Sequence, residues 1–455
     1  MLEQLKAFFE GKSIVILGFG VEGKATYRLI RRLLPEIEIV VADGNEKSKT
    51  VEIAQGDVHC RFQVGENYTD NLADFDMVIK SPGISMKGLP KMDDEKLTSQ
   101  TELFIRFYRN QIIGITGTKG KSTTSSLIYH LIKQHSDDCV LVGNIGTPPF
   151  ELIDSIGKDT IVVYELSSHQ LEHIKVSPHV AILLNFFQEH LDHYASYEKY
   201  QEAKFNIALH QTAEDFLIYN YDDALIRQWI EKSALASSLT PFSLNTKLMR
   251  GAFAKDSMIS HIDRNDLEYI FNSEDTQLKG RHNFLNIMAA VCAAKLCIVP
   301  DEKISNGLKS FQPLAHRIEF VGTYEDVHYY NDSISTIPEA TMAAVNALKE
   351  VDTLILGGFD RGIYYDDLMD FVENSAVRNL IFIDEAGKRM RDIYLKKHYG
   401  KKNIFSVDTL IESVKLAKQH TAKRNICLLS PAAASYGMFK NFEERGEAFK
   451  QIVRS

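Results

Sequence analysis

Residues 112–124 read IIGITGTKGKSTT and carry the clearest structural signal in the chain. The isoleucine-rich start is typical of a strand buried in a parallel sheet. A turn with two glycines, Gly117 and Gly120, comes next, and helical periodicity then runs from about Ser122 to Gln134. Glycine lets the backbone approach a phosphate closely, and a helix N-terminus attracts anions. The segment therefore predicts a phosphate-binding loop between a strand and a helix.

The loop departs from the strict G-x-x-x-x-G-K-[ST] pattern, because Ile115 stands where the first glycine belongs. A chance Gly-Lys-Ser at a helix start is the alternative, and the strand–loop–helix context argues against it. Lys121 is placed to reach the β- and γ-phosphates of a nucleotide, and the Ser122 hydroxyl to bind Mg²⁺. The residues of this predicted ATP loop are Gly117, Thr118, Lys119, Gly120, Lys121, Ser122 and Thr123.

The length and composition of the chain limit the classes of protein to which it can belong. A chain of 455 residues suggests about three domains. Its net charge of −9 argues against a nucleic-acid partner, and five scattered cysteines without a C-x-x-C pair predict neither a zinc site nor a disulfide framework. Segment 1–13 reads as an amphipathic helix rather than a signal peptide, and the chain has no apolar run that could span a membrane. We expect a cytoplasmic monomer.

The first domain, predicted over 1–99, carries a second glycine loop. A strand at 13–17 leads into Gly-Phe-Gly-Val-Glu-Gly at 18–23, a helix to about Leu34, and a strand at 37–42 that ends at Asp43. This is G-x-G-x-x-G in a βαβ unit with an acid downstream, which alone indicates an NAD-binding domain. The same loop also suits any nucleotide diphosphate, so both alternatives stay open.

The central domain, predicted over 100–313, places polar residues where its strands end. Strands at 139–142, 160–164 and 180–184 are followed by Asn144, Glu165 and His190, respectively. In a doubly wound parallel sheet, ligands bind beyond the carboxyl ends of the strands. Glu165 is then a Mg²⁺ ligand or a helix-capping carboxylate. His190 binds a second Mg²⁺, orients substrate, or is a partly buried structural histidine.

The remaining sequence predicts a further turn and a third sheet. Gly280 to Asn283 precede an apolar helix at 284–297, so that Asn283 either faces a phosphate or caps this helix. The third domain, predicted over 314–455, has strand patterns at 327–330, 353–356, 380–383 and 426–429. The predicted fold class is α/β, with three Rossmann-like domains, of which the central one is a P-loop, ATP-binding, doubly wound parallel sheet.

Nine blocks of sequence resemble the Mur ligases, which build the peptide stem of bacterial peptidoglycan. The last and longest of them is most similar to the glutamate-adding branch, the MurD type, which joins glutamate to UDP-N-acetylmuramoyl-L-alanine. The nine blocks are GTKGKST (117–123), GNIG (143–146), ELSSHQLE (165–172), EHLDHY (189–194), GRHN (280–283), HR (316–317), NDS (331–333), GGFDRG (357–362) and SPAAASYGMFKNFEERG (430–446).

The resemblance implies an ATP- and Mg²⁺-dependent amide ligase that works through an acyl phosphate. The implied catalytic residues are Lys121, Glu165, His190 and Lys204, and the implied nucleotide contacts beyond the loop are Asn283, Arg317 and Asp332. The implied magnesium ligands are Ser122, Glu165, His190 and Lys204. Lys204, which would otherwise be an ordinary lysine of a helix at 197–210, matches a lysine that is carbamylated in this family.

The resemblance also implies the substrate contacts. The UDP-linked substrate would lie on Gly18, Gly20, Val21, Glu22, Gly23, Asp43, Ser81, Gly83, Asn144 and His190. The incoming glutamate would lie on Arg361, Ser435 and Phe442.

One position departs from the family pattern. MurD-type ligases usually have lysine in the segment where this chain reads Asp332-Ser333-Ile334-Ser335-Thr336. Isoleucine cannot supply that charge, so either another cation replaces it, with Arg361 the candidate, or the amino-acid pocket differs. D-Glutamate is the substrate that the family implies. A family variant that adds L-glutamate resembles this chain in the segment and in Glu22, which makes L-glutamate the alternative.

Three other classes are disfavoured. An NAD-dependent oxidoreductase would account for the first glycine loop alone. A non-catalytic nucleotide-binding scaffold would not need Lys121, Glu165, His190 and Lys204 together. Folylpolyglutamate synthase shares the ATP domain, and it lacks both the first domain and the block at 430–446.

Overall fold

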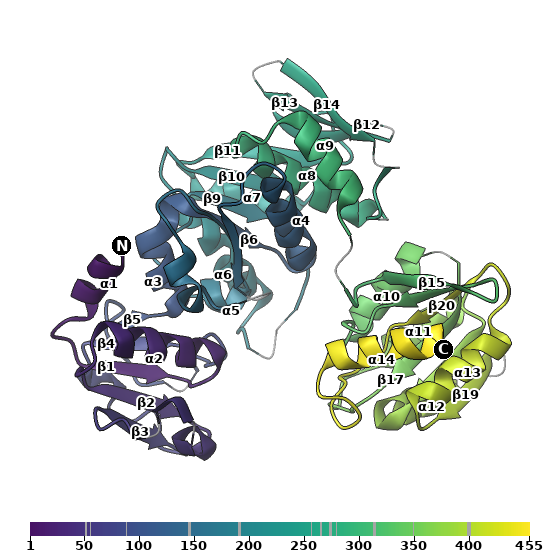
Figure 1. Ribbon diagram of the computed structural model, residues 1–455, viewed down its shortest axis with the longest axis horizontal. Helices are drawn as coiled ribbons and strands as arrows, with labels where there is room; N and C mark the ends of the chain where they lie inside the picture. Colours follow the sequence, from purple (N-terminus) through teal and green to yellow (C-terminus); the bar gives the residue numbers. More distant parts are fainter. Residues whose placement is uncertain are drawn as a thin grey trace. The chain divides into compact units, whose positions relative to one another are not determined.

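The computed structural model divides the chain into two compact units (Figure 1). Unit 1 comprises Met1–Thr276 and Arg281–Phe311, and unit 2 comprises Gln277–Gly280 and Gln312–Ser455. No helix in the described part of the chain is both long and apolar enough to cross a lipid bilayer. The structure describes residues 1–50, 52–54, 56–87, 89–143, 147–189, 193–255, 257–263, 266–272, 275–278, 280–312, 315–348, 350–397 and 402–455.

The first sheet of unit 1 is parallel throughout, in the order β3-β2-β1-β4-β5. Its strands alternate between two apolar layers because successive side chains point to opposite faces. Ile14 and Ile16 of β1 enter one layer, and Val15 and Leu17 enter the other. The elements are α1 (Leu2–Phe9), β1 (Ile14–Leu17), α2 (Val21–Leu33), β2 (Ile39–Asp43), η1 (Glu46–Thr50), η2 (Glu52–Ala54), β3 (Cys60–Val64), η3 (Leu72–Asp74), β4 (Met77–Lys80) and β5 (Leu97–Thr98).

The central sheet has the order β14-β13-β12-β11-β10-β9-β6-β8-β7. It is parallel from β7 to β12 and antiparallel from β12 to β14. Its strands are β6 (Ile112–Thr116), β7 (Cys139–Gly143), β8 (Ile161–Glu165), β9 (Val180–Leu183), β10 (Phe216–Asn220), β11 (Ser238–Ser243), β12 (Gly251–Lys255), β13 (Met258–Asp263) and β14 (Asp266–Asn272).

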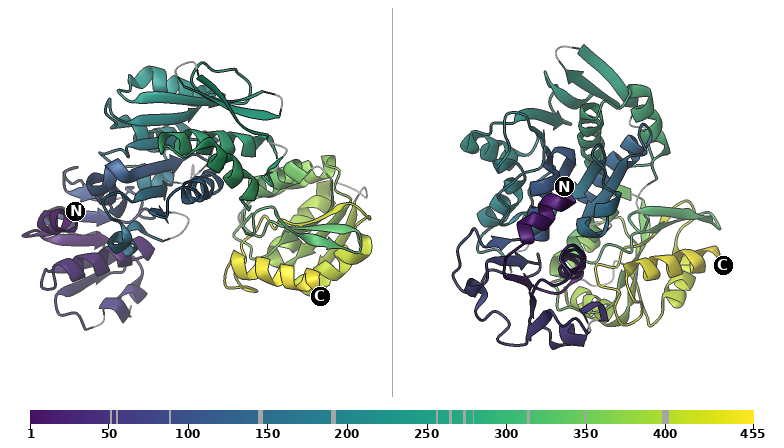
Figure 2. Two further views of the ribbon diagram at one scale, coloured as in Figure 1. Left: turned by 45° about the horizontal axis from the view of Figure 1, so that its top comes forward. Right: turned by 60° about the vertical axis from the view of Figure 1, so that its left-hand side comes forward.

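Helices α4 and α8 lie side by side, with α4 over β6–β8 and α8 over β10–β12 (Figures 1 and 2). The helices of this part are α3 (Gln100–Tyr108), η4 (Arg109–Gln111), α4 (Lys121–Lys133), η5 (Pro149–Glu151), η6 (Ile153–Ser155), α5 (Ser168–Leu171), α6 (Tyr197–Leu209), α7 (Ala224–Ser233), α8 (Arg281–Leu296) and α9 (Asp301–Ser310).

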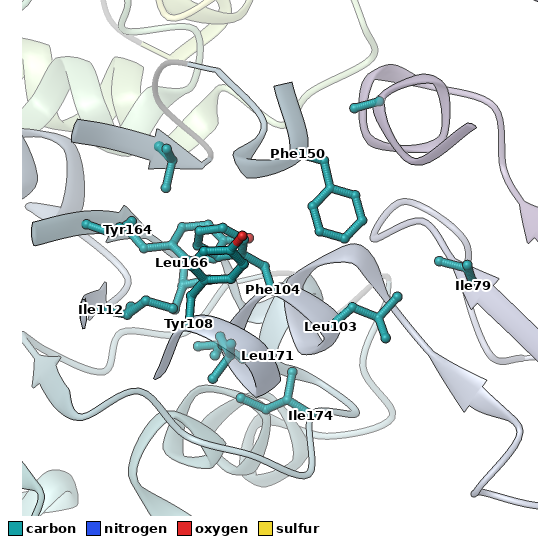
Figure 3. Packing of buried hydrophobic residues seen from close by; sticks show 14 of the residues in the cluster. Ile79, Leu103, Phe104, Tyr108, Ile112, Phe150, Tyr164, Leu166, Leu171 and Ile174 are labelled. Atoms are coloured by element: carbon teal, nitrogen blue, oxygen red, sulfur yellow. The ribbon is translucent and has the colours of Figure 1, made fainter. Parts of the chain in front are cut away.

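One apolar core joins the first and central sheets within unit 1. Helix α3 inserts Phe104 and Tyr108 beside Tyr164 of β8, while Ile79 of β4 belongs to the same cluster (Figure 3). Ion pairs between Arg28 of α2 and Glu151, and between Arg32 and Asp154, add surface contacts. The glycine loops that follow β1 and β6 are therefore held in one body.

The sheet of unit 2 has the order β15-β16-β20-β17-β18-β19, and only β15 runs antiparallel to its neighbour. Leu354 and Leu356 of β17 point to the α10–α12 side, whereas Ile355 points to the α13–α14 side. The elements are β15 (Glu319–Tyr324), β16 (Val327–Asn331), α10 (Pro338–Leu348), β17 (Val351–Gly357), α11 (Asp366–Asn374), β18 (Asn379–Ile383), α12 (Asp384–Lys397), β19 (Asn403–Val407), α13 (Leu410–His420), β20 (Ile426–Leu429) and α14 (Phe442–Arg454). The three parallel-dominated sheets confirm the predicted α/β class.

Candidate active site

The predicted ATP loop connects β6 to α4, as its sequence indicates. The Lys119 N–H donates to the Asn185 side chain at 2.9 Å, and the Thr118 hydroxyl lies 2.9 Å from the Tyr200 hydroxyl. Lys119 also pairs with Glu189. Thr118 and Thr123 are buried, while Lys119, Lys121 and Ser122 are half-buried. The loop is thus supported by the segment that follows β9.

A side chain at Gly120 would be strained by the backbone conformation and would require the end of the Asn286 side chain to shift. The φ of Gly120, +86°, lies in the left-handed region, and an added Cβ would lie 2.4 Å from the side-chain oxygen of Asn286. Asn286 in turn donates to Asn283 at 3.0 Å. Helix α8 begins at Arg281, so Asn283 lies inside its first turn and the interpretation of Asn283 as an N-cap is wrong. The start of α4 therefore lies next to Asn286 of α8, a contact that the sequence did not predict.

Lys121 and Lys204 share one acceptor. Both amino groups donate to the Gly117 carbonyl, at 2.8 Å and 2.9 Å, and Lys121 donates also to the Thr118 carbonyl at 3.0 Å. Lys204 lies on α6 with only 2% of its surface exposed. Burial, reinforced by the positive charge of Lys121, lowers the pKa of Lys204 well below its usual value. Lys204 is therefore a buried amine next to the phosphate loop rather than a surface cation.

The described oxygen ligands at this place fit a hard cation. Glu165 ends β8 and is fully buried, and the Ser125 hydroxyl lies 3.4 Å from its carboxylate and 3.2 Å from the Ser122 carbonyl. Ser125 thus places the Glu165 carboxylate next to the start of α4, and carboxylate and hydroxyl oxygens are ligands that Mg²⁺ favours. Asn144 and His190 lie outside the described residues, so their predicted roles stay predictions.

The first glycine loop lies between β1 and α2. The Ser81 hydroxyl donates to the Gly18 carbonyl at 2.8 Å, and a Cβ on Gly23 would lie 2.1 Å from the same oxygen. Asp43 accepts the Phe19 N–H at 2.6 Å, so its carboxylate supports the loop backbone. The exposed neighbours Gly20 and Val21 begin α2, whose N-terminus is an anion-binding position.

Glu22 of this loop connects the two sheets of unit 1. Its carboxylate accepts from the Gln170 side chain at 2.7 Å, and its second oxygen is buried without a hydrogen-bond partner in the described chain. Burial raises the pKa of Glu22 to about 7, while Gln170 and Lys80 oppose the shift. Gln170 also caps α5, which follows Glu165 by three residues. A connection from the first glycine loop to the Glu165 strand end was not predicted.

A cavity of about 370 Å³ brings both glycine-loop regions together. It reaches from the turn after β4, through the ends of β8 and β9, to the phosphate loop and α6. Its lining includes Gly83 from the predicted UDP contacts and Lys121 and Lys204 from the predicted catalytic set. The lining residues are Pro82, Gly83, Lys121, Ser167, Ser168, His169, Glu189, Tyr200 and Lys204.

Unit 2 holds the predicted nucleotide contacts Arg317 and Asp332. Asp332 follows β16, is fully buried, and accepts the Ser430 hydroxyl at 2.7 Å and the Ile318 N–H at 3.2 Å. Burial raises the pKa of Asp332 to about 6, against the hydrogen bonds and the charge of Arg317. The Nε of Arg317 is buried and has no hydrogen-bond partner among the described residues. A cation with an unsatisfied donor fits an anionic ligand such as a nucleotide phosphate.

Asp332→Asn is expected to stabilise the ligand-free protein at neutral pH. A raised carboxyl pKa means that the folded state loses stability as pH rises from about 4 through 6, by up to about 3 kcal/mol. The amide removes this cost, so the variant's gain in melting temperature should be larger at pH 7.5 than at pH 5.

The control for this prediction is Asp392→Asn on α12, where the carboxylate is 56% exposed. This control should change the melting temperature equally at both pH values. If the difference in melting temperature between Asp332→Asn and the wild type is the same at pH 5 and pH 7.5, the free-energy cost assigned to burial of the Asp332 carboxylate is contradicted.

The predicted glutamate contacts gather on loops at the carboxyl ends of β17 and β20. The Arg361 guanidinium donates to the Thr336 carbonyl at 2.7 Å, which attaches it to the loop that carries Ile334. Ser435 is buried, and Phe442 begins α14 with its carbonyl accepting the Ser333 hydroxyl at 2.8 Å. Arg361, Ser435 and Phe442 therefore belong to one group of neighbouring loops in unit 2.

Two kinds of comparison place the chain among known proteins. The Mur ligase middle domain matches residues 115–294. Over 453 residues, 98% of each chain, the protein is 34% identical to the UDP-N-acetylmuramoylalanine--D-glutamate ligase of Thermoanaerobacter sp. (strain X514). It is also 34% identical to the enzyme of that name from Acetivibrio thermocellus, over 100% of this chain and 98% of the relative.

Solved structures agree on the fold. A UDP-N-acetylmuramate-alanine ligase, MurC, from Thermotoga maritima is similar with a TM-score of 0.57, at 16% identity over 97% of this chain and 99% of that one. The MurF ligase of Thermotoga maritima, solved in complex with ADP, has a TM-score of 0.58 at 16% identity, over 97% and 95% of the two chains. With near-complete coverage by relatives of one name, the chain belongs to the MurD-type branch of the Mur ligase family.

Proposed function

We propose that this chain is an ATP-dependent ligase that joins D-glutamate to UDP-N-acetylmuramoyl-L-alanine, in cytoplasmic synthesis of peptidoglycan precursors. The cavity of unit 1 is the observation that carries this proposal, because it combines Gly83, beside the first glycine loop, with Lys121 and Lys204 of the phosphate-loop region. A substrate whose diphosphate lies on the first loop could present its carboxylate to the second. The names of the relatives support D-glutamate as the amino acid.

The proposed reaction has two steps. A carboxylate oxygen of the alanyl group attacks the γ-phosphorus of ATP, the bond to the β-phosphate oxygen breaks, and ADP leaves an acyl phosphate. The glutamate amine then attacks the acyl carbon, loses a proton, and displaces inorganic phosphate. Lys121 stabilises the negative charge that develops on the transferred phosphoryl group. Mg²⁺, bound by Ser122, Glu165, His190 and carbamylated Lys204, would neutralise the phosphate charges.

The remaining assignments follow the same proposal. Arg317 and Asp332 contact the nucleotide, and the buried Arg317 Nε without a partner supports this. Asn283 contacts it through the first turn of α8, next to the loop at Gly120. The uridine diphosphate lies at the N-terminus of α2, where backbone N–H groups attract anions.

L-Glutamate is the second candidate for the amino acid, and one observation favours it. Ile334 stands at the usual lysine position, and the Arg361 guanidinium, from the loop after β17, reaches the Thr336 carbonyl of the Ile334 loop. A fork-shaped guanidinium from a different loop binds a carboxylate with other geometry than a lysine would. A changed pocket of this kind is compatible with the opposite enantiomer.

The test is phosphate release by the purified protein with ATP, Mg²⁺ and UDP-N-acetylmuramoyl-L-alanine, with D- and L-glutamate compared. Release with D-glutamate at least tenfold faster supports the first candidate, and the reverse supports the second. Reactions without the UDP substrate measure background ATP hydrolysis. Release with neither enantiomer above that background would refute the ligase proposal as stated.

A further inference from the structure

A buried arginine without a carboxylate partner lies against the candidate glutamate contacts. Arg445 is only 3% exposed, and no carboxylate of the described chain forms an ion pair with it. It sits in the first turn of α14, where the helix dipole disfavours a cation. Burial lowers the pKa of Arg445 to about 10, which leaves it charged at neutral pH. Such a costly placement needs strong compensation or a function.

Hydrogen bonds to two loops compensate the burial. Nε donates to the Ser333 hydroxyl at 3.0 Å, and Nη2 donates to the Ser333 carbonyl at 2.8 Å. On the other loop, Nη1 donates to the Ala434 carbonyl and Nη2 to the Ala433 carbonyl, both at 3.1 Å. One guanidinium therefore fixes the loop of Ile334 against the loop of Ser435.

The guanidinium also adjoins the third loop of the site, at Gly358. A Cβ on Gly358 would lie 3.0 Å from Nη1 of Arg445 and 2.3 Å from the Ala434 carbonyl oxygen. The next residue, Phe359, donates its N–H to that same oxygen at 2.9 Å. Arg361 follows two residues later. The loops of Arg361 and Ser435, which carry candidate glutamate contacts, and the loop of Ile334 thus meet at Arg445.

The charge of Arg445 acts through peptide groups. Its acceptors, the carbonyls of Ser333 and Ala434, belong to peptides whose N–H groups are those of Ile334 and Ser435. A cation bound to a carbonyl strengthens the N–H of the same peptide as a donor, because hydrogen bonds in a chain polarise one another. The Ser435 N–H forms no hydrogen bond with any described residue. It is therefore a polarised donor that no described residue uses.

We propose that Arg445 is the positioning residue for a carboxylate of the incoming amino acid: it holds three loops in register and supplies a fixed positive charge beneath them. The inference rests on the proposed function, since it concerns the amino-acid step of that reaction.

The experiment compares Arg445→Met and Arg445→Lys with the wild type in the phosphate-release assay, using the glutamate enantiomer that the wild type accepts. Arg445→Met should raise KM for glutamate at least tenfold, with KM for ATP changed less than threefold. Arg445→Lys should recover part of this loss, because lysine keeps the positive charge but lacks the planar guanidinium with its several N–H donors. An equal rise in both KM values would indicate general damage to the fold and overturn the proposal.

A second readout depends on charge alone. The two amides of glutamate, glutamine and isoglutamine, each lack one carboxylate. The proposal expects the ratio of kcat/KM for glutamate to that for one of these amides to fall at least fivefold in Arg445→Met. The amide for which this ratio falls shows which of the two glutamate carboxylates Arg445 helps to bind. An unchanged ratio for both amides would refute a role in carboxylate recognition.

Arg378→Met is the matched control. Arg378 pairs with Asp352 at 2.6 Å near the start of β17, in the same unit and at the opposite end of the strands from the loops. It should leave KM for glutamate unchanged. Should the wild type release no phosphate at all, the ligase proposal fails by itself. The role of Arg445 is then tested by thermal shift. Glutamate at 10 mM should raise the melting temperature of the wild type and of Arg378→Met, and it should not raise that of Arg445→Met. A wild type without this shift would overturn the inference.

Discussion

Lys121→Ala is expected to lower kcat for phosphate release by about 10²- to 10³-fold, the range found when one preorganised charge is removed from a developing anion. The Lys121 amino group lies over the loop on the carbonyls of Gly117 and Thr118, from which it can turn to a phosphate. No other described residue of the cavity carries an unburied amino group beside that loop. The measurement is steady-state kinetics with saturating ATP, glutamate and UDP substrate.

Lys133→Ala is the control for this prediction, because Lys133 ends the same helix and binds the Asp137 carbonyl at the surface. It should keep kcat within twofold. Melting temperatures of both variants should stay close to that of the wild type, since alanine favours helix at either position. A Lys121→Ala enzyme with more than a tenth of wild-type kcat would exclude the proposed role.

Lys204→Ala is expected to reduce kcat at least 100-fold, and the wild type should lose activity in buffers freed of CO₂. Carbamylation joins the lysine nitrogen to the carbon of CO₂ and releases one proton, so it requires an uncharged amine. Burial and the neighbouring Lys121 charge lower the pKa of Lys204 and provide that amine. The product is a carboxylate-like anion beside the phosphate loop and within electrostatic reach of Glu165, which suits a cation site better than an ammonium does.

The control for Lys204 lies on the same helix. Lys199 is 63% exposed and pairs with Glu202, so Lys199→Ala should leave kcat unchanged. Mass spectrometry of the native protein at high bicarbonate should show one added CO₂ in the wild type and none in Lys204→Ala. Full activity of the wild type after removal of CO₂, with no mass increase in bicarbonate, would rule out the carbamate.

The strands and loops of the candidate site follow from local sequence. Apolar runs such as 112–116 leave few alternatives to a buried strand, and the glycines at 117 and 120 mark where the backbone turns. The predicted helix at 122–134 is observed at Lys121–Lys133, and the strand at 180–184 at Val180–Leu183. Helix α8 begins three residues before the prediction, because apolar periodicity starts later than the helix itself.

Contacts between distant segments had no local signal. Asn286 looks like one polar residue in an apolar helix, and its importance appears only through its distance from Gly120. Arg445 lies in a charged stretch, FEERG at 442–446, yet tertiary packing buries it against Ser333 and Ala434. Lys204 was identified through family resemblance alone, since burial of a lysine cannot be read from a helical pattern with charges on it.

The close approach of Asn286 to Gly120 joins the phosphate loop to a helix far along the chain. A side chain at position 120 would require the end of the Asn286 side chain to shift, and it would have to adopt a left-handed backbone conformation that glycine adopts most readily. A phosphate loop grafted onto another scaffold would lose the neighbour that Asn286 of α8 provides at this glycine.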